Sequence, residues 1–188
     1  MSTTKIYSQN DILLNKLLTF YYAEDNLNKM LSIINGTSKI SLRIVDWFTT
    51  NYSKKNYIIY DNPNYKRFKV YEDYKLRLKA YSKKRFDPFC RWERISVPIA
   101  ENSEYSFETT IGQLNFFKWA LENNIIHYIE QNYDVIEDDM NDNNSLSKIK
   151  KMNKSDIHDK TRKKREELSI NAIKTFKREK VEITVTFD

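Results

Sequence analysis

Apolar and polar positions follow helical periodicity near the start of the chain. Over 12–22 the apolar residues recur every three or four positions, which places them on one face of an α-helix. Asp11 directly precedes this segment and is the predicted N-cap, because short polar side chains accept hydrogen bonds from the first turn. The same spacing predicts a second helix over 25–35, and Gly36 supplies its C-terminal stop.

A third helix and short strands are predicted next. Helical spacing begins near Ser38 and fades into the polar run TTNYSKKN. The aromatic and β-branched residues of 57–60 then predict a strand, which is bounded by the turn signal DNPN. Phe68 and Val70 indicate either a second short strand or direct entry into another helix.

The middle of the chain predicts a basic helix and a further strand. Tyrosine and leucine form a stripe over 71–81, with lysine and arginine on the other faces. We expect this helix to end before Pro88, because the residue that precedes a proline is disfavoured in the α conformation. Alternation of apolar and polar residues over 95–99 predicts a strand.

The strongest helical pattern covers 111–133, where a continuous apolar seam runs through the segment. Thr109 or Thr110 is the predicted N-cap, and Gln113 lies three residues after Thr110, as in a capping box. The polar stretch of 141–159 indicates a flexible linker. Alternating apolar residues over 181–188 predict a terminal strand.

These patterns predict an α+β fold: a mainly helical domain with a small β-sheet and a basic C-terminal extension that ends in a strand. The chain has only two glycines and three prolines, which disfavours all-β folds because their turns consume both residues. We expect the mainly helical domain over 1–140, the polar linker over 141–159, and a basic helix plus the terminal β-strand over 160–188.

Charge is distributed in blocks along the chain. The overall net charge is +6, but 62–100 carries +7, 101–147 carries −9 and 148–180 carries +8. Such blocks either are solvated faces and partner sites or neutralise one another within the fold. The choice between these two states decides whether the protein has a basic surface.

Two basic runs are the candidate nucleic-acid sites. Lysine and arginine neutralise phosphates and release counterions, and aromatic rings stack on unpaired bases. The first run is interleaved with Phe86, Phe89 and Trp92, which we predict to be core residues. The second run has three interpretations: it follows a phosphate backbone, it is a nuclear localisation signal, or it is a solvated helix start. The candidate contacts to DNA or RNA are Lys83, Lys84, Arg85, Arg91 and Arg94 in the first run and Lys160, Arg162, Lys163, Lys164 and Arg165 in the second.

Other reactive residues form no recognisable catalytic or metal-binding motif. Cys90 and His127 would be a nucleophile and base only if the fold brought them together, and a small buried cysteine is far more common. A single cysteine forms neither an internal disulfide nor a Cys-based zinc site. The carboxylates of 137–142 lack the spacing and the glycine of a calcium loop. We therefore predict no enzyme activity, no bound metal and no cofactor.

Three segments resemble a protein family of nucleocytoplasmic large DNA viruses, in the mimivirus and phycodnavirus group. They are ISLRIVDWFTTNYSKKN (40–56), VYEDYKLRLKAYSKKRFDPFCRWERI (70–95) and FETTIGQLNFFKWALENNIIHYIEQN (107–132), with the ending RKKREELS and VEITVTFD. The resemblance carries over no functional residue. It implies a viral protein that acts in the viral factory of the host cytoplasm or in the nucleus, or that is packaged in the virion.

The leading hypothesis is a non-enzymatic viral nucleic-acid-associated protein that serves transcription or genome packaging. The alternative is a structural or assembly protein, or an adaptor, that docks its acidic block on a basic block of another copy or another viral protein. In that case the terminal strand would add to a partner's sheet. No membrane partner is expected, because no stretch approaches the roughly 18–20 apolar residues of a spanning helix.

Overall fold

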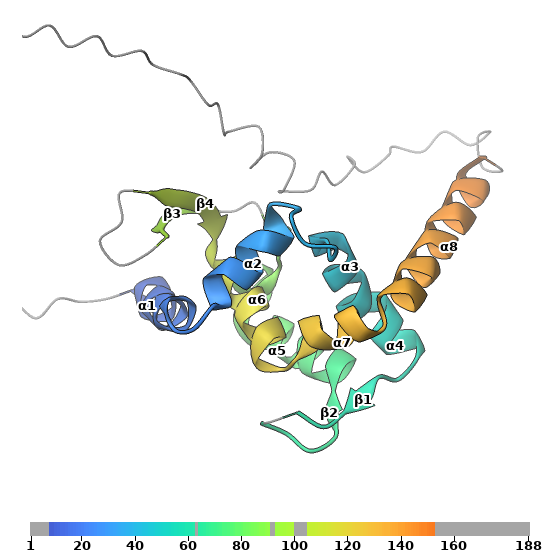
Figure 1. The fold of residues 1–188 in the computed structure, drawn as a ribbon, viewed down its shortest axis with the longest axis horizontal. Coiled ribbons are helices and arrows are strands. Elements are labelled where there is room, and N and C mark those ends of the chain that lie inside the picture. Colours follow the sequence, from blue (N-terminus) through green and yellow to red (C-terminus); the bar gives the residue numbers. More distant parts are fainter. Residues whose placement is uncertain (1–7, 63, 91–92, 100–104, 153–188) are drawn as a thin grey trace, which may run out of the picture.

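The computed structural model describes residues 8–62, 64–90, 93–99 and 105–152, which form a mainly helical fold with two small antiparallel sheets (Figure 1). This confirms the predicted α+β class. The helical elements are α1 (Gln9–Tyr22), α2 (Asn26–Ile34), α3 (Leu42–Trp47), the π-helical turn η1 (Phe48–Tyr52), α4 (Ser53–Lys55), α5 (Val70–Phe86), α6 (Ile111–Glu122), α7 (Ile125–Gln131) and α8 (Tyr133–Met152). The strands are β1 (Ile59–Tyr60), β2 (Phe68–Lys69), β3 (Arg94–Pro98) and β4 (Ser106–Thr110). The predicted basic helix and terminal strand of 160–188 lie outside the described residues.

Side chains near the ends of α1 and α2 explain where these helices begin and end. Ser8 is the N-cap of α1, because its Oγ accepts from the Asp11 N–H at 3.2 Å while the Asp11 carboxylate accepts from the Ser8 N–H at 2.9 Å. This reciprocal pair is a capping box, so the predicted N-cap, Asp11, is wrong and belongs to the first turn instead. The hydrogen bonds from Ser8 lower the pKa of the Asp11 carboxyl. Gly36, with φ of +71°, follows α2 as predicted.

The third predicted helix is longer than its apolar pattern indicates. Elements α3, η1 and α4 follow one another directly and include the polar run that was expected to end the helix. Small hydroxyl side chains in this run donate back to their own helix: Thr50 Oγ1 to the Asp46 carbonyl at 2.6 Å, and Ser53 Oγ to the Thr49 carbonyl at 3.0 Å. These bonds satisfy the hydroxyls within the helix itself, so a polar sequence remains helical.

The long helix predicted over 111–133 is instead divided into α6 and α7. The break lies at Asn123 and Asn124, and Asn124 has a φ of +56° in the left-handed region that asparagine tolerates better than most residues. Asn123 is buried, and its Nδ2 donates to the Trp119 carbonyl at 2.8 Å. The apolar seam gave no sign of this break, because it continues at similar spacing on both sides.

Helix α8 continues through Met152, so the first twelve residues of the predicted linker, 141–152, are helical. Ile136 and Met140 on this helix are buried and anchor its first half to the core. A helix that is anchored in this way propagates into polar sequence, because each further residue adds one backbone hydrogen bond. The remainder of the predicted linker, 153–159, lies outside the described residues.

The strands form two separate antiparallel pairs. β1 pairs with β2, with Ile59 opposite Lys69 and Tyr60 opposite Phe68, and α5 begins at the next residue. The sequence left a strand and a helix as alternatives here, and the chain forms both in succession. β3 pairs with β4, which the sequence did not predict because Thr110 was assigned only to a helix cap. Thr110 has both roles, since it ends β4 and accepts from the Gln113 N–H at 3.1 Å.

Helix α6 lies at the centre of the fold, between α1 and α5 (Figure 1). Its buried aromatic side chains form a cluster with α5: the ring centroids of Phe86 and Trp119 are 5.5 Å apart, and those of Phe86 and Phe116 are 5.9 Å apart. On the α1 side, the buried Tyr21 hydroxyl donates to the Leu114 carbonyl at 2.6 Å. Burial raises the pKa of Tyr21 well above its usual value. Each buried aromatic side chain contributes roughly 1.5–3 kcal/mol.

Gly112 permits the closest approach between α5 and α6. A Cβ atom at this position would lie 2.9 Å from the Lys84 carbonyl oxygen and 3.0 Å from that of Asp87. Three residue positions further on, the Asn115 side chain donates to the Arg85 carbonyl at 2.8 Å, which satisfies an unpaired carbonyl at the end of α5. The start of α6 therefore holds the basic end of α5 in place.

We predict that Gly112→Ala lowers the free energy of unfolding by about 1–2 kcal/mol, because the added methyl group meets backbone carbonyls that cannot rotate away. Urea denaturation followed by circular dichroism measures the change. A helical Gly→Ala substitution without this contact would stabilise the protein by roughly 0.5–1 kcal/mol. An increase in stability would therefore show that α5 and α6 are farther apart than described.

Candidate nucleic-acid interface

Helix α5 has a buried inner face and a basic outer face. Tyr74 is buried against Trp119, with ring centroids 5.9 Å apart. Asp73 lies at the boundary, where its carboxylate accepts from Trp119 Nε1 at 2.6 Å and pairs with Arg77 Nε at 3.4 Å. These contacts fix the rotation of α5 about its axis, so the lysines on the opposite side remain exposed to water.

An open depression, which we call the α5 groove, lies on this outer side. It brings together Lys75, Lys79 and Lys83, which recur at intervals of four residues. Leu76 lies among them with 65% of its surface exposed, so apolar and cationic groups alternate in the groove. The lining residues are Tyr71, Glu72, Lys75, Leu76, Leu78, Lys79 and Lys83.

A second depression, which we call the Tyr57 pocket, adjoins the α5 groove and shares Tyr71 and Glu72 with it. It encloses about 370 Å³ between the end of α4, β1 and the first turn of α5. Lys54 Nζ lies 5.6 Å from the centroid of the Tyr71 ring, and Lys69 Nζ pairs with Glu72 at 3.2 Å. The lining residues are Ser53, Lys54, Tyr57, Ile58, Ile59, Lys69, Tyr71 and Glu72.

Together the two depressions form a continuous lining of five lysines, with Glu72 as its one carboxylate. Sequence reasoning missed Tyr57 and Lys54, because they lie outside the basic run and Tyr57 was assigned to a strand. The strand begins only at Ile59, and Tyr57 belongs to the turn before it. The available signal was the pair of lysines flanked by tyrosines in YSKKNY. It did not indicate a site, because the sequence does not show that α5 lies beside this segment.

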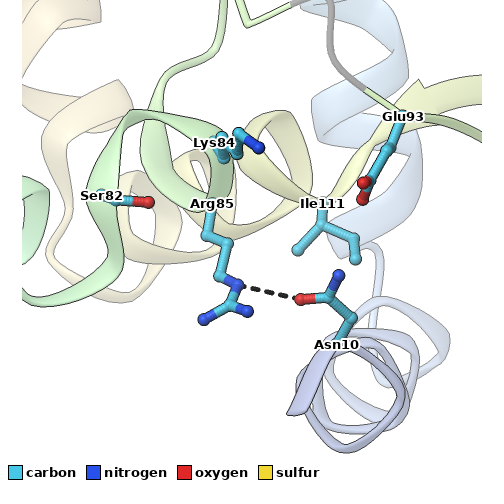
Figure 2. A pocket seen from close by; sticks show the side chains of 6 residues that line it. All are labelled: Asn10, Ser82, Lys84, Arg85, Glu93 and Ile111. Atoms are coloured by element: carbon cyan, nitrogen blue, oxygen red, sulfur yellow. Dashed lines mark hydrogen bonds between the residues drawn. The ribbon is translucent and has the colours of Figure 1, made fainter. Parts of the chain in front are cut away.

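The predicted basic trio of residues 83–85 is divided between two faces. Lys83 lines the α5 groove, whereas Lys84 and Arg85 line a different pocket with Ser82, Glu93, Asn10 and Ile111 (Figure 2). The backbone explains the division, because Ser82 interrupts the helical conformation with φ of +64° and ψ of 167°. Of the residues after it, Lys84 and Arg85 do not continue the lysine row of α5.

Arg85 is anchored to helix α1. Its Nε donates to the Asn10 side-chain oxygen at 2.8 Å, and one terminal nitrogen donates to the Gln9 side-chain oxygen at 3.4 Å. Figure 2 shows the guanidinium directed at Asn10, while Glu93 enters the same pocket from the opposite side. Both partners of Arg85 are neutral amides, so the contact fixes the position of the cation without neutralising it.

Of the remaining predicted cations, only Arg94 is among the described residues, and it does not line the groove. Arg94 lies on β3 and pairs with Glu108 of β4 at 3.3 Å. Arg91 and the second basic run, Lys160, Arg162, Lys163, Lys164 and Arg165, lie outside the described residues. They stay predictions.

The acidic run on α8 has partners on α3 and α4. The Asp139 carboxylate accepts from Trp47 Nε1 at 3.1 Å and pairs with Lys55, and this hydrogen bond raises the pKa of Lys55. Glu137 accepts from the Tyr133 hydroxyl at 3.0 Å on the same helix. The contacts described for Asp139 and Glu137 thus engage groups other than the lysines of the α5 groove.

The reactive residues considered from the sequence are placed as follows. Cys90 is a free, half-buried thiol, and His127 is exposed on α7 beside Glu130 and Gln131. Within residues 8–152 as far as they are described, no group of three His, Cys, Asp or Glu side chains could hold a metal ion. No helix in that part of the chain is both long and apolar enough to cross a bilayer.

The aromatic residues of the first basic run belong to the core where they are described. Phe86 is fully buried, and Phe89 is partly buried against the same cluster, as predicted. Trp92 lies outside the described residues. Two other rings, Tyr57 and Tyr71, line the Tyr57 pocket.

Comparison with known proteins identifies the family. A model described as "Family of unknown function (DUF7197)" matches residues 3–187. "Uncharacterized protein L507" of Acanthamoeba polyphaga mimivirus is 47% identical over 130 residues, which cover 66% of this chain and 50% of that protein. The chain thus spans about half the length of this relative. No solved structure matches the chain. The matches confirm the resemblance to a protein family of large DNA viruses, and the chain belongs to the family of unknown function DUF7197.

Proposed function

We propose that this viral protein is a non-enzymatic nucleic-acid-associated protein that binds the phosphate backbone through its basic segments, in transcription or genome packaging. The observation that carries the proposal is the row of Lys75, Lys79 and Lys83 in one open groove. The cytoplasmic viral factory, the virion and the host nucleus are all compartments in which such a protein meets nucleic acid.

The spacing of these lysines is unfavourable for the helix itself. Lys75 and Lys79 are four residues apart on α5, and like charges at this spacing destabilise a helix by about 0.2–0.5 kcal/mol. An anionic partner converts this repulsion into attraction, because it places a negative charge beside each cation. Successive phosphates of a nucleic-acid strand supply such charges, and the counterions that they release add to the affinity.

A second candidate function is assembly, supported by the apolar character of the groove. Leu76 is exposed between the lysines, and an acidic segment of another copy would offer both charge and apolar contacts. The acidic positions of α8 are the obvious source within this chain. This candidate makes a different prediction, namely salt-sensitive self-association without affinity for nucleic acid.

We expect the variant Lys75→Ala/Lys79→Ala/Lys83→Ala to weaken binding to DNA and RNA while the protein remains folded, because all three side chains are exposed. Each lost phosphate contact should reduce the slope of log affinity against log salt by roughly 0.7–0.9. Fluorescence anisotropy across a salt series measures this slope.

The matched control is Lys16→Ala/Lys29→Ala/Arg43→Ala, which removes the same charge from α1, α2 and α3. It should retain the slope of the unmodified protein. If the unmodified protein does not bind nucleic acid at low salt, the proposed function is wrong. Sedimentation at two salt concentrations would then test assembly.

A second pair of variants separates anchoring from surface charge. We predict that Arg85→Ala lowers the free energy of unfolding by about 1 kcal/mol, because it removes the hydrogen bonds to Asn10 and Gln9. Lys83→Ala, two residues earlier and exposed, should leave the stability unchanged. Chemical denaturation compares the two, and equal stability of both variants would contradict the anchoring role of Arg85.

A further inference from the structure

Tyr57 occupies a backbone position that normally belongs to glycine. It follows Asn56, the C-cap of α4, and the next N–H, that of Ile58, donates to the Ser53 carbonyl at 3.2 Å. This is the longer hydrogen bond of a Schellman motif, in which the residue after the C-cap adopts a left-handed conformation. Tyr57 has the expected positive φ, +50°. Bulky side chains are strongly disfavoured there, because Cβ approaches the following carbonyl oxygen.

The strained tyrosine gains no burial in return. Its side chain is among the most exposed of the large apolar residues described, with 84% of its surface in water. A core role therefore does not explain the ring, and a glycine would suit the turn better. Backbone strain that the fold does not use points to a role at the surface.

The surroundings of Tyr57 suit one partner chemistry. Lys54 and Lys69 lie in the same pocket, Tyr71 offers a second ring, and Glu72 offers a hydrogen-bond acceptor. The volume of about 370 Å³ lies at the small end of the range for ligand pockets, roughly 300–1,000 Å³. Cations beside an exposed ring match a phosphate beside an aromatic base, and the α5 groove continues the cationic lining.

We infer that the protein binds single-stranded nucleic acid, with one unpaired base stacked on Tyr57 while Lys54 and Lys69 contact the flanking phosphates and the α5 groove follows the strand. This inference rests on the proposed function and adds a strand preference to it. A duplex offers phosphates to the α5 groove, but its bases are already stacked on one another. The Tyr57 ring therefore contributes stacking only for unpaired strands.

The test compares a labelled oligo(dT) strand with a duplex of the same length, by fluorescence anisotropy at fixed salt. The unmodified protein should bind the single strand more tightly. Tyr57→Ala should weaken single-strand binding by roughly 5- to 150-fold, since base stacking on an aromatic ring is worth about 1–3 kcal/mol, and leave duplex binding unchanged. Tyr57→Phe keeps the ring and should retain the preference.

Tyr57→Gly provides a readout that a merely structural residue would not give. It should weaken single-strand binding as Tyr57→Ala does, yet raise the melting temperature by roughly 2–4 °C, because glycine accepts the positive φ. The control is Tyr105→Ala, which removes another exposed tyrosine beside the β3–β4 pair, at the opposite end of the fold from β1 and β2 (Figure 1). It should leave the strand preference unchanged.

The outcomes separate this inference from the proposed function. Equal affinity for single strand and duplex, with no effect of Tyr57→Ala, would overturn the inference and leave backbone binding intact. Absence of all nucleic-acid binding at low salt would overturn both. Self-association that Lys75→Ala/Lys79→Ala/Lys83→Ala abolishes, without nucleic-acid binding, would assign the same surface to a second copy of the chain.

Discussion

The close packing of α5 against the start of α6 is the contact on which the rest of the structure depends. Gly112 leaves no room for a side chain between α6 and the Lys84 and Asp87 carbonyls, and Asn115 bonds to the last turn of α5. Phe86 and Trp119 pack immediately beside this contact. Because several interactions of different kinds fix the same helix, α5 cannot rotate its lysines toward the interior. Its outer face remains cationic as a consequence of how its inner face is packed.

Positive φ values mark both ends of the surface formed by the α5 groove and the Tyr57 pocket. Tyr57 lies at one end, and Ser82 interrupts α5 at the other, in a conformation that is found almost only for glycine. After the Ser82 break, Lys83 lines the groove, whereas Arg85 donates to Asn10 of α1. Each conformation costs stability that the core must supply. Such costs are typical of residues whose placement matters for binding.

The acidic run of α8 and the lysines of α5 have different surroundings in the fold. Asp139 on α8 pairs with Lys55 at the end of α4, whereas the lysines of α5 line an open depression. The ion pair between Asp139 and Lys55 holds the acidic helix against α4 and does not neutralise the lysines of the α5 groove. For a member of a viral family of unknown function, this charge arrangement is the most direct physical guide to its partners.

The sequence by itself determined the class of fold, the approximate position of the helices and the burial of Phe86, because these features follow from local periodicity. It also located the basic run that includes Lys83. It did not reveal the strand β4. It also did not reveal the break at Asn124 or the Schellman turn at Tyr57, because the spacing of apolar residues does not indicate where a single residue adopts a left-handed conformation. Only the tertiary structure decided that Lys83 and Arg85 face different pockets and that Tyr57 joins Tyr71. The physical reason is that a surface combines residues distant in sequence, and their adjacency depends on how α5 packs against α6 rather than on any local preference.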